Sequence, residues 1–150
     1  MGRLVNIDST GTERNRLRRT IAEALRLLGQ KGDIDDEARD LTALIVFSLR
    51  QIASGVETSA VAWEKRDYYM KADRFRTQWA WVGLSAGELE KILRQGRWNA
   101  LPTALARLLP HFSDIKLTKM TRTPDLWQGC YDRLLKEDKQ KIASYGSHPH

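Results

Sequence analysis

Residues 41–49 read Leu-Thr-Ala-Leu-Ile-Val-Phe-Ser-Leu, and this stretch decides the fold. On a helix its apolar side chains point in nearly every direction, which is typical of a helix surrounded by other helices. The stretch is nine residues long, less than half of the roughly 20 residues that span a membrane. It therefore predicts the central helix of a helical bundle.

The central helix has a clear start and an ambiguous end. Four acidic residues lie between positions 33 and 37, where the positive end of a helix dipole favours negative charge. Further on, Ser-Gly-Val-Glu at 54–57 has the pattern of a capping box, which starts a new helix. We favour a break there, with the next helix over 57–82, because Ser and Gly are poor in a helix interior. The alternative is that residues 33–82 form one helix bent at Gly55, because the apolar spacing continues in phase.

Start and stop signals mark out the rest of the chain as helical. Further helices are predicted over residues 11–29, 85–96, 99–110 and from 123 onward. Two of them begin at capping boxes, Thr10–Glu13 and Ser85–Glu88, and the last begins with Pro124 at its first helical position. Residues 111–122 are predicted to be an extended connector. These signals predict an all-α, single-domain bundle of five or six helices over residues 1–143, with a disordered tail over 144–150.

Composition narrows the class of protein. The chain has 150 residues, a formal net charge of +6 and 41% hydrophobic residues, which is ordinary for a globular domain. Its one cysteine, Cys130, excludes an internal disulfide framework and a zinc site built on paired thiolates. We expect this thiol to be buried and inert on the last helix. The chain is expected to be cytoplasmic, with no membrane partner.

Sequence motifs for catalysis are missing. The chain contains no glycine-rich nucleotide-binding loop, no His-Glu-x-x-His and no Gly-x-Ser-x-Gly. Of its three histidines, two lie within the last three residues, and His111 is expected to be a capping or surface residue. We therefore expect no catalytic residues, no cofactor and no metal ion. Whether the protein is an enzyme stays open, although we favour a non-enzymatic role.

Residues 63–81 are the one unusual segment, since they hold six of the twelve aromatic residues of the chain. We expect Tyr68, Phe75 and Trp79 to face the core. In the structural interpretation, which we favour, the arginines of this helix stack on aromatic rings and reach carboxylates on neighbouring helices. In a second interpretation the segment is a protein-binding surface, because Trp, Tyr and Arg dominate binding energy at interfaces. In a third its arginines hold an anionic ligand. The proposed binding residues are Trp63, Arg66, Tyr69, Asp73, Arg74, Arg76 and Trp81.

Two basic clusters raise the question of nucleic acid. One is at residues 14–19, and the other, at 116–122, comprises Lys116, Lys119 and Arg122. Residues 33–62 carry a net charge of −4, whereas the rest of the chain carries +10. The acidic stretch at 33–40 is therefore an alternative partner for the first cluster, within the fold or across a dimer. No helix-turn-helix spacing, zinc knuckle or aromatic RNA-binding signature supports binding to DNA or RNA.

These observations predict a non-enzymatic, cytoplasmic helical module that binds a protein partner or itself. The first alternative is a nucleic-acid-associated protein that uses clusters 14–19 and 116–122. The second alternative is an enzyme or anionic-ligand carrier with a site between helices near Arg66, Asp73 and Arg74.

Overall fold

The computed structural model describes residues 7–137 of the chain. Helices account for 79% of these residues and none of them lies in a strand, which confirms the predicted all-α bundle. The predicted tail over 144–150 lies outside this range. Within the described residues, every helix is too short or too polar to cross a membrane.

The α-helices are α1 (Ile7–Gly29), α2 (Asp36–Glu64), α3 (Tyr69–Gln78), α4 (Ala80–Gln95) and α5 (Leu101–Leu108). There are 3-10 turns at Trp98–Ala100, Leu109–Phe112 and Pro124–Leu126, and further helical residues at 130–137.

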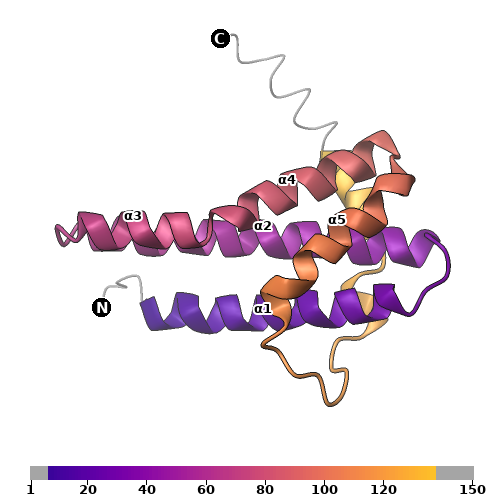
Figure 1. Cartoon of the computed structure of the whole chain (residues 1–150), viewed down its shortest axis with the longest axis horizontal. Coiled ribbons are helices and arrows are strands. Elements are labelled where there is room, and N and C mark those ends of the chain that lie inside the picture. The colour runs from indigo at the N-terminus through magenta and orange to yellow at the C-terminus, as the bar shows by residue number, and fades with distance from the viewer. Residues whose placement is uncertain (1–6, 138–150) are drawn as a thin grey trace, which may run out of the picture.

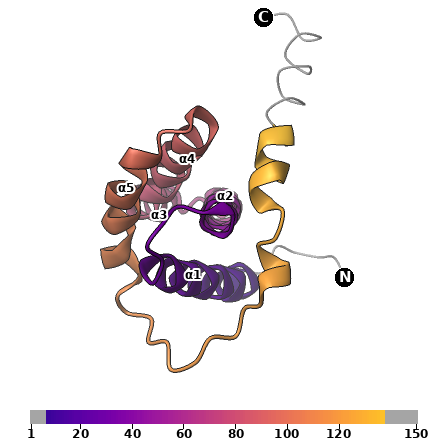
Figure 2. The same ribbon diagram turned by 90° about the vertical axis from the view of Figure 1, so that its right-hand side faces the viewer.

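The predicted central helix is α2. Figure 2, which looks along it, shows α1 on one side, α4 and α5 on another, and helical residues 130–137 on a third. Leu41, Ile45 and Leu49 of α2 are completely buried. At its start Asp35 accepts a hydrogen bond of 2.8 Å from the backbone N–H of Ala38, so the acidic start signal is also confirmed.

The predicted break at residues 54–57 is wrong, and so is the single helix over 57–82. Instead α2 continues to Glu64, the chain turns over residues 65–68, and α3 returns beside α2 (Figure 1). Helix continues through Gly55 because Val56, Ala60 and Trp63 are buried on the same side as the preceding apolar residues. Their packing outweighs the weak helix propensity of Ser and Gly.

Two capping boxes also do not start helices. α1 begins at Ile7, before Thr10, and α4 begins at Ala80, before Ser85. The Thr10 hydroxyl lies 3.0 Å from that of Ser59 on α2, so it joins two helices instead. At the other end, Pro124–Leu126 forms a 3-10 turn, and helical residues resume at 130. Capping patterns predicted that helices exist here but not where they begin.

The predicted core face of residues 57–82 is only partly buried. Ala72 is completely buried, whereas Phe75 and Trp79 are half-buried. Tyr68, which we expected in the core, is 53% exposed. The reason is that the α2–α3 hairpin extends past the described start of α1, so no third helix covers its end (Figure 1).

Candidate functional site

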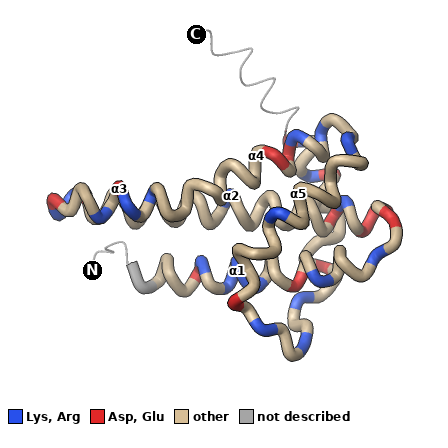
Figure 3. Tube along the Cα trace, in the orientation of Figure 1, with Lys and Arg blue, Asp and Glu red and all other residues tan. Residues whose placement is uncertain are grey.

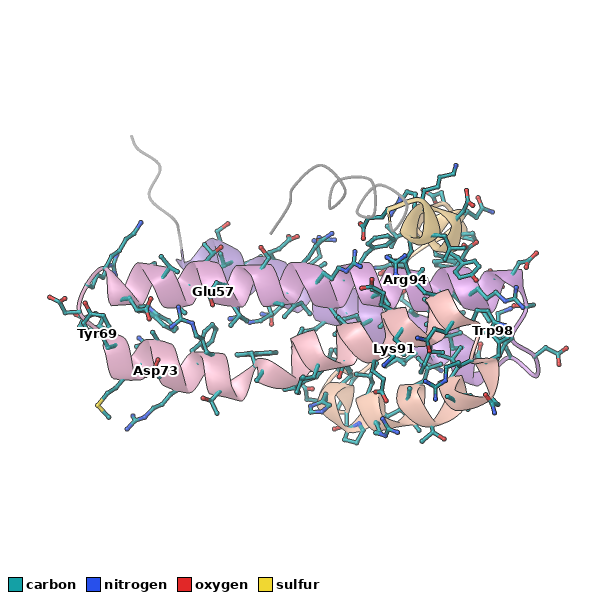
Figure 4. All side chains as sticks on the ribbon, turned by 90° about the horizontal axis from the view of Figure 1, so that it is seen from above. Glu57, Tyr69, Asp73, Lys91, Arg94 and Trp98 are labelled. Carbon is teal, nitrogen blue, oxygen red and sulfur yellow. The ribbon has the colours of Figure 1, made fainter. Side chains whose placement is uncertain are left out.

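The hairpin end, which we define as residues 65–71, is a turn with large side chains on its outside. Asp67 reverses the chain with a backbone φ of 65°, a left-handed conformation that Asp tolerates better than most residues. The backbone N–H of Tyr68 then donates to the carbonyl of Trp63 at 2.9 Å, which closes the turn. Beyond it, Tyr69 lies at the extremity of the molecule (Figure 4) and its hydroxyl is 3.4 Å from a carboxylate oxygen of Asp67.

Three consecutive side chains project from this turn. Tyr68, Tyr69 and Met70 are 53%, 58% and 68% exposed. They border an open groove of about 970 Å³. Its lining includes Trp63 and Phe75, whose rings meet edge to face at 4.8 Å. The ammonium group of Lys71 lies 4.5 Å from the centre of the Trp63 ring, and such cation–π contacts help hold both side chains in place.

Three cations around the hairpin end have no acidic partner in the part of the chain that the structure describes. Lys65, Arg66 and Arg74 are exposed and form no ion pair with any residue from 7 to 137. Arg74 lines the groove beside Trp63, while Lys65 and Arg66 lie on the α2 side of the hairpin. Positive charge is therefore available to a ligand on both sides of the exposed aromatic residues.

Arg76 is different, because it fastens α3 to α2. Its guanidinium donates to Glu57 at 3.0 and 2.8 Å and to Glu64 at 2.6 and 3.1 Å. These hydrogen bonds lower the pKa of both carboxyl groups and raise the pKa of Arg76. Asp73 is 3.8 Å from Arg76 with a side chain that is 78% exposed. Arg76 is thus structural, as we expected for the segment as a whole.

The seven predicted binding residues do not form one surface. Trp63, Tyr69 and Arg74 meet at the groove. Arg66 lies on the other side of the hairpin, and Asp73 and Arg76 belong to the ion-pair cluster with Glu57 and Glu64. Arg66, Asp73 and Arg74 therefore do not converge on one anion.

Trp81 lies apart from the other six, on α4. Its ring stacks on that of His111, with centroids 3.7 Å apart and planes at 8°. His111 is exposed, as predicted. The stack joins the start of α4 to the turn after α5, so Trp81 has a packing partner within the fold.

Sequence reasoning missed Tyr68, Met70 and Lys71 as part of the groove. One signal for them was available, since Tyr-Tyr-Met at positions 68–70 cannot all face the core of one helix. We placed Tyr68 in the core because we extended one helix through the turn.

The first basic cluster is largely engaged within the fold. Arg18 pairs with Asp114 at 2.7 Å, Arg19 with Glu23 at 2.9 Å, and Arg16 with Glu13 at 2.5 Å. None of these partners belongs to the acidic stretch 33–40, so the suggested pairing within the fold is wrong, while pairing across a dimer stays a prediction. Since α1 and α2 run in opposite directions, the start of α1 lies far from the start of α2.

In the second basic cluster, Lys116 and Lys119 are exposed and without ion pairs among the described residues. Arg122 instead donates to the Thr20 hydroxyl at 3.0 Å and to the Arg16 carbonyl at 2.9 Å. Nucleic-acid binding by these clusters stays a prediction, with two lysines free to contact phosphate.

The side chains of the hairpin end are suited to binding a ligand. It presents aromatic faces, a flexible thioether and guanidinium and ammonium groups, which suit an apolar and acidic ligand. Elsewhere, Cys130 is completely buried, as predicted, and burial raises the pKa of its thiol, which favours the protonated form. In the part of the chain that the structure describes, no three His, Cys, Asp or Glu side chains gather as metal ligands.

Comparison with protein-family models, with curated proteins and with solved structures finds no match to this chain. Function is therefore inferred from the geometry of the hairpin end.

Proposed function

We propose that this chain is a cytoplasmic protein-binding module whose recognition surface is the hairpin end and its groove. The observation that carries the proposal is that Tyr68, Tyr69 and Met70 are each more than half exposed, side by side. Single exposed apolar side chains are common on proteins, but contiguous ones typically mark an interaction site. Tyr, Met and Arg are also the residue types enriched at protein interfaces.

The charges beside these residues favour an acidic partner surface. Arg66 and Arg74 lie on either side of the exposed aromatic residues and have no carboxylate among the described residues to neutralise them. A partner that supplies carboxylates gains charge-assisted hydrogen bonds here, and removing these cations from water is then compensated. The cytoplasmic location is part of the proposal because a single, buried thiol suits a reducing compartment.

The hairpin supports such a surface rigidly. Trp63 and Ala72 are buried between its two helices, and Arg76 joins them at four hydrogen bonds. The side chains at its end are therefore held on a fixed platform, which lowers the entropy lost on binding.

In vivo photo-crosslinking tests this proposal. A photoreactive phenylalanine derivative replaces Tyr69, and in a control chain it replaces Leu84, which is 76% exposed on α4. We expect a discrete crosslinked protein with the probe at position 69 and none at 84. The adduct should disappear when Arg66→Glu and Arg74→Glu are added, because the partner is then repelled. Equal labelling at both positions, or no adduct at 69, would contradict the proposal.

A further inference from the structure

A second surface of the molecule is complementary to the hairpin end. An apolar groove of about 370 Å³ lies where the end of α1, the loop to α2 and α5 meet. We call it the loop groove. Its walls include Leu28, Ile34, Leu105 and Leu109, of which Leu109 is 54% exposed. The groove lies within the range of roughly 300–1,000 Å³ typical of ligand pockets, so it has room for large side chains.

The rim of the loop groove is acidic. Residues 31–37 carry a net charge of −3, whereas the hairpin end carries +2. Lys31 contributes a positive charge to this loop, but it is paired with Asp35 at 3.1 Å and Glu37 at 2.8 Å. Asp33, which lines the groove, and Asp36, two residues before Ala38 of its wall, are exposed and have no ion pair among the described residues.

These two surfaces lie at opposite ends of one continuous helix. The loop groove is at the start of α2 and the hairpin end follows its last residue. Figure 3 shows acidic positions in the loop before α2 and basic positions on α3 towards the other end. α2 has 29 residues, so at 1.5 Å per residue it separates them by roughly 43 Å. A molecule therefore cannot place its hairpin end in its own groove.

We propose that the hairpin end of one molecule docks into the loop groove of a second copy of the same chain, an inference that rests on the function proposed above. Tyr69 and Met70 enter the apolar groove, and Lys65 and Arg66 face Asp33 and Asp36. The two halves of the contact match in both respects, since exposed apolar side chains with unpaired cations meet an apolar groove with unpaired carboxylates. Each copy carries one half at each end.

Such a contact joins unlike surfaces and leaves a free surface at either end of the pair. Head-to-tail contacts of this kind build open chains unless their geometry closes a ring. Association should therefore continue beyond a dimer as concentration rises. Association should also weaken with salt. The distance over which exposed charges attract each other falls from about 30 Å at 0.01 M ionic strength to about 3 Å at 1 M.

Sedimentation velocity of the full chain, from micromolar to millimolar concentration, tests the inference with two reversed-charge variants. The hairpin variant carries Lys65→Glu and Arg66→Glu, which reverses the charge of the hairpin end. The groove variant carries Asp33→Lys and Asp36→Lys, which reverses the charge of the groove rim. All four side chains are exposed and form no ion pairs among residues 7–137, so the variants should fold. Each alone should associate at least about tenfold more weakly than the parent.

A mixture of the two variants is the decisive arm. Equal amounts should associate again, because the first variant supplies an intact groove and the second an intact hairpin end. A matched control for the hairpin variant carries Lys116→Glu and Lys119→Glu, which lowers the net charge by the same amount at a different exposed site, and it should associate like the parent.

Three results would overturn the inference. The parent chain could stay monomeric at low salt, the groove variant could associate as strongly as the parent, or the mixture could fail to associate. A monomeric parent that still gives the crosslinked adduct at position 69 would leave the proposed function standing with a different protein as the partner. Absence of both association and adduct would remove the two together.

Discussion

The hairpin end and the junction between α1 and residues 111–122 both carry several basic side chains, yet they use them in opposite ways. At the junction, Arg18 reaches Asp114 and the carbonyl of His111, and Arg26 donates to the carbonyl of Leu117 at 2.9 Å. At the hairpin end, Arg66 has no such acceptor among the described residues, and neither has Arg74, which lies next to the hairpin end on α3. The density of basic side chains therefore does not distinguish a structural region from a binding surface. The two are distinguished by whether hydrogen-bond acceptors of the fold lie within reach of the basic groups.

The junction contains one buried carboxylate, that of Glu23, which binds basic and backbone N–H groups from two segments. Glu23 on α1 has a side chain only 1% exposed. It accepts hydrogen bonds from the backbone N–H groups of Thr121 and Arg122, both at 2.8 Å, and from the Thr121 hydroxyl at 2.7 Å. Arg19 adds a fourth at 2.9 Å. The end of the irregular segment 111–122 is thereby fixed against a helix.

The largest expected effect is therefore the loss of Glu23. Glu23→Ala leaves two backbone donors without their acceptor and Arg19 without its carboxylate. Breaking a buried ion pair in this way typically costs about 3–5 kcal/mol. We expect a loss of that size in the free energy of unfolding measured in urea.

Glu13→Ala is the matched control for this prediction. Glu13 lies on the same helix and pairs with Arg16, but both side chains are 51% exposed. Its loss should lower stability by no more than about 1 kcal/mol, as for surface ion pairs generally. Similar losses in the two variants would mean that Glu23 does not anchor the connector.

Acid should also remove the stability that Glu23 contributes to this junction. Burial alone would raise the pKa of Glu23, but the hydrogen bonds from Arg122, Thr121 and Arg19 lower it to about 2, against 4.5 for a free glutamate. A depressed pKa stabilises the fold fully above pH 4.5, and the contribution is lost as the pH falls towards 2. The difference corresponds to about 3 kcal/mol.

Urea unfolding between pH 6 and pH 2 checks this prediction against Glu23→Gln. Other paired carboxyl groups, among them Asp114 and Glu90, also have lowered pKa values and contribute to the acid sensitivity of both proteins. The parent should nevertheless lose more stability than the variant over this range, because glutamine does not titrate. Parallel curves would show that Glu23 is not held ionised by the fold.

Much of the fold could be predicted because its signals are local. The apolar stretch at 41–49 and the acidic start of α2 depend on neighbours within a few residues, and both were predicted correctly. The turn at 65–68 could not be found in this way, since it contains no Gly or Pro. Its position depends on Ala60 and Ala72, both completely buried where α3 packs against α2. No local pattern in the sequence predicts the contact between these two alanines.

The candidate site was predicted in part for the same reason. Its residue types identified Trp63, Tyr69 and Arg74, which do line the groove. The helix that we assumed through the turn wrongly assigned Tyr68 to the core. Glu23 was missed entirely, because its backbone partners are 98 and 99 residues away in the chain. Partners so distant produce no spacing pattern.

The smallest expected effects separate Arg76 from Arg74, two residues apart on α3. Arg76→Ala removes hydrogen bonds to two carboxylates from a guanidinium that is 31% exposed. We expect a measurable loss in the free energy of unfolding, because four hydrogen bonds that hold α3 to α2 are removed. Arg76→Lys should recover only part of it, because lysine keeps the charge but not the forked geometry.

Arg74→Ala should change the free energy of unfolding by no more than about 0.5 kcal/mol, as for surface substitutions generally. Arg74 is exposed and, among residues 7–137, has no ion pair to lose. Urea unfolding of the two variants side by side makes the measurement. Should Arg74→Ala prove as destabilising as Arg76→Ala, the guanidinium of Arg74 would be needed by the fold and would not be available to a partner. A stable Arg74→Ala chain that loses its crosslinked adduct at position 69 would instead place that guanidinium in the binding surface, where its exposure beside the aromatic residues puts it.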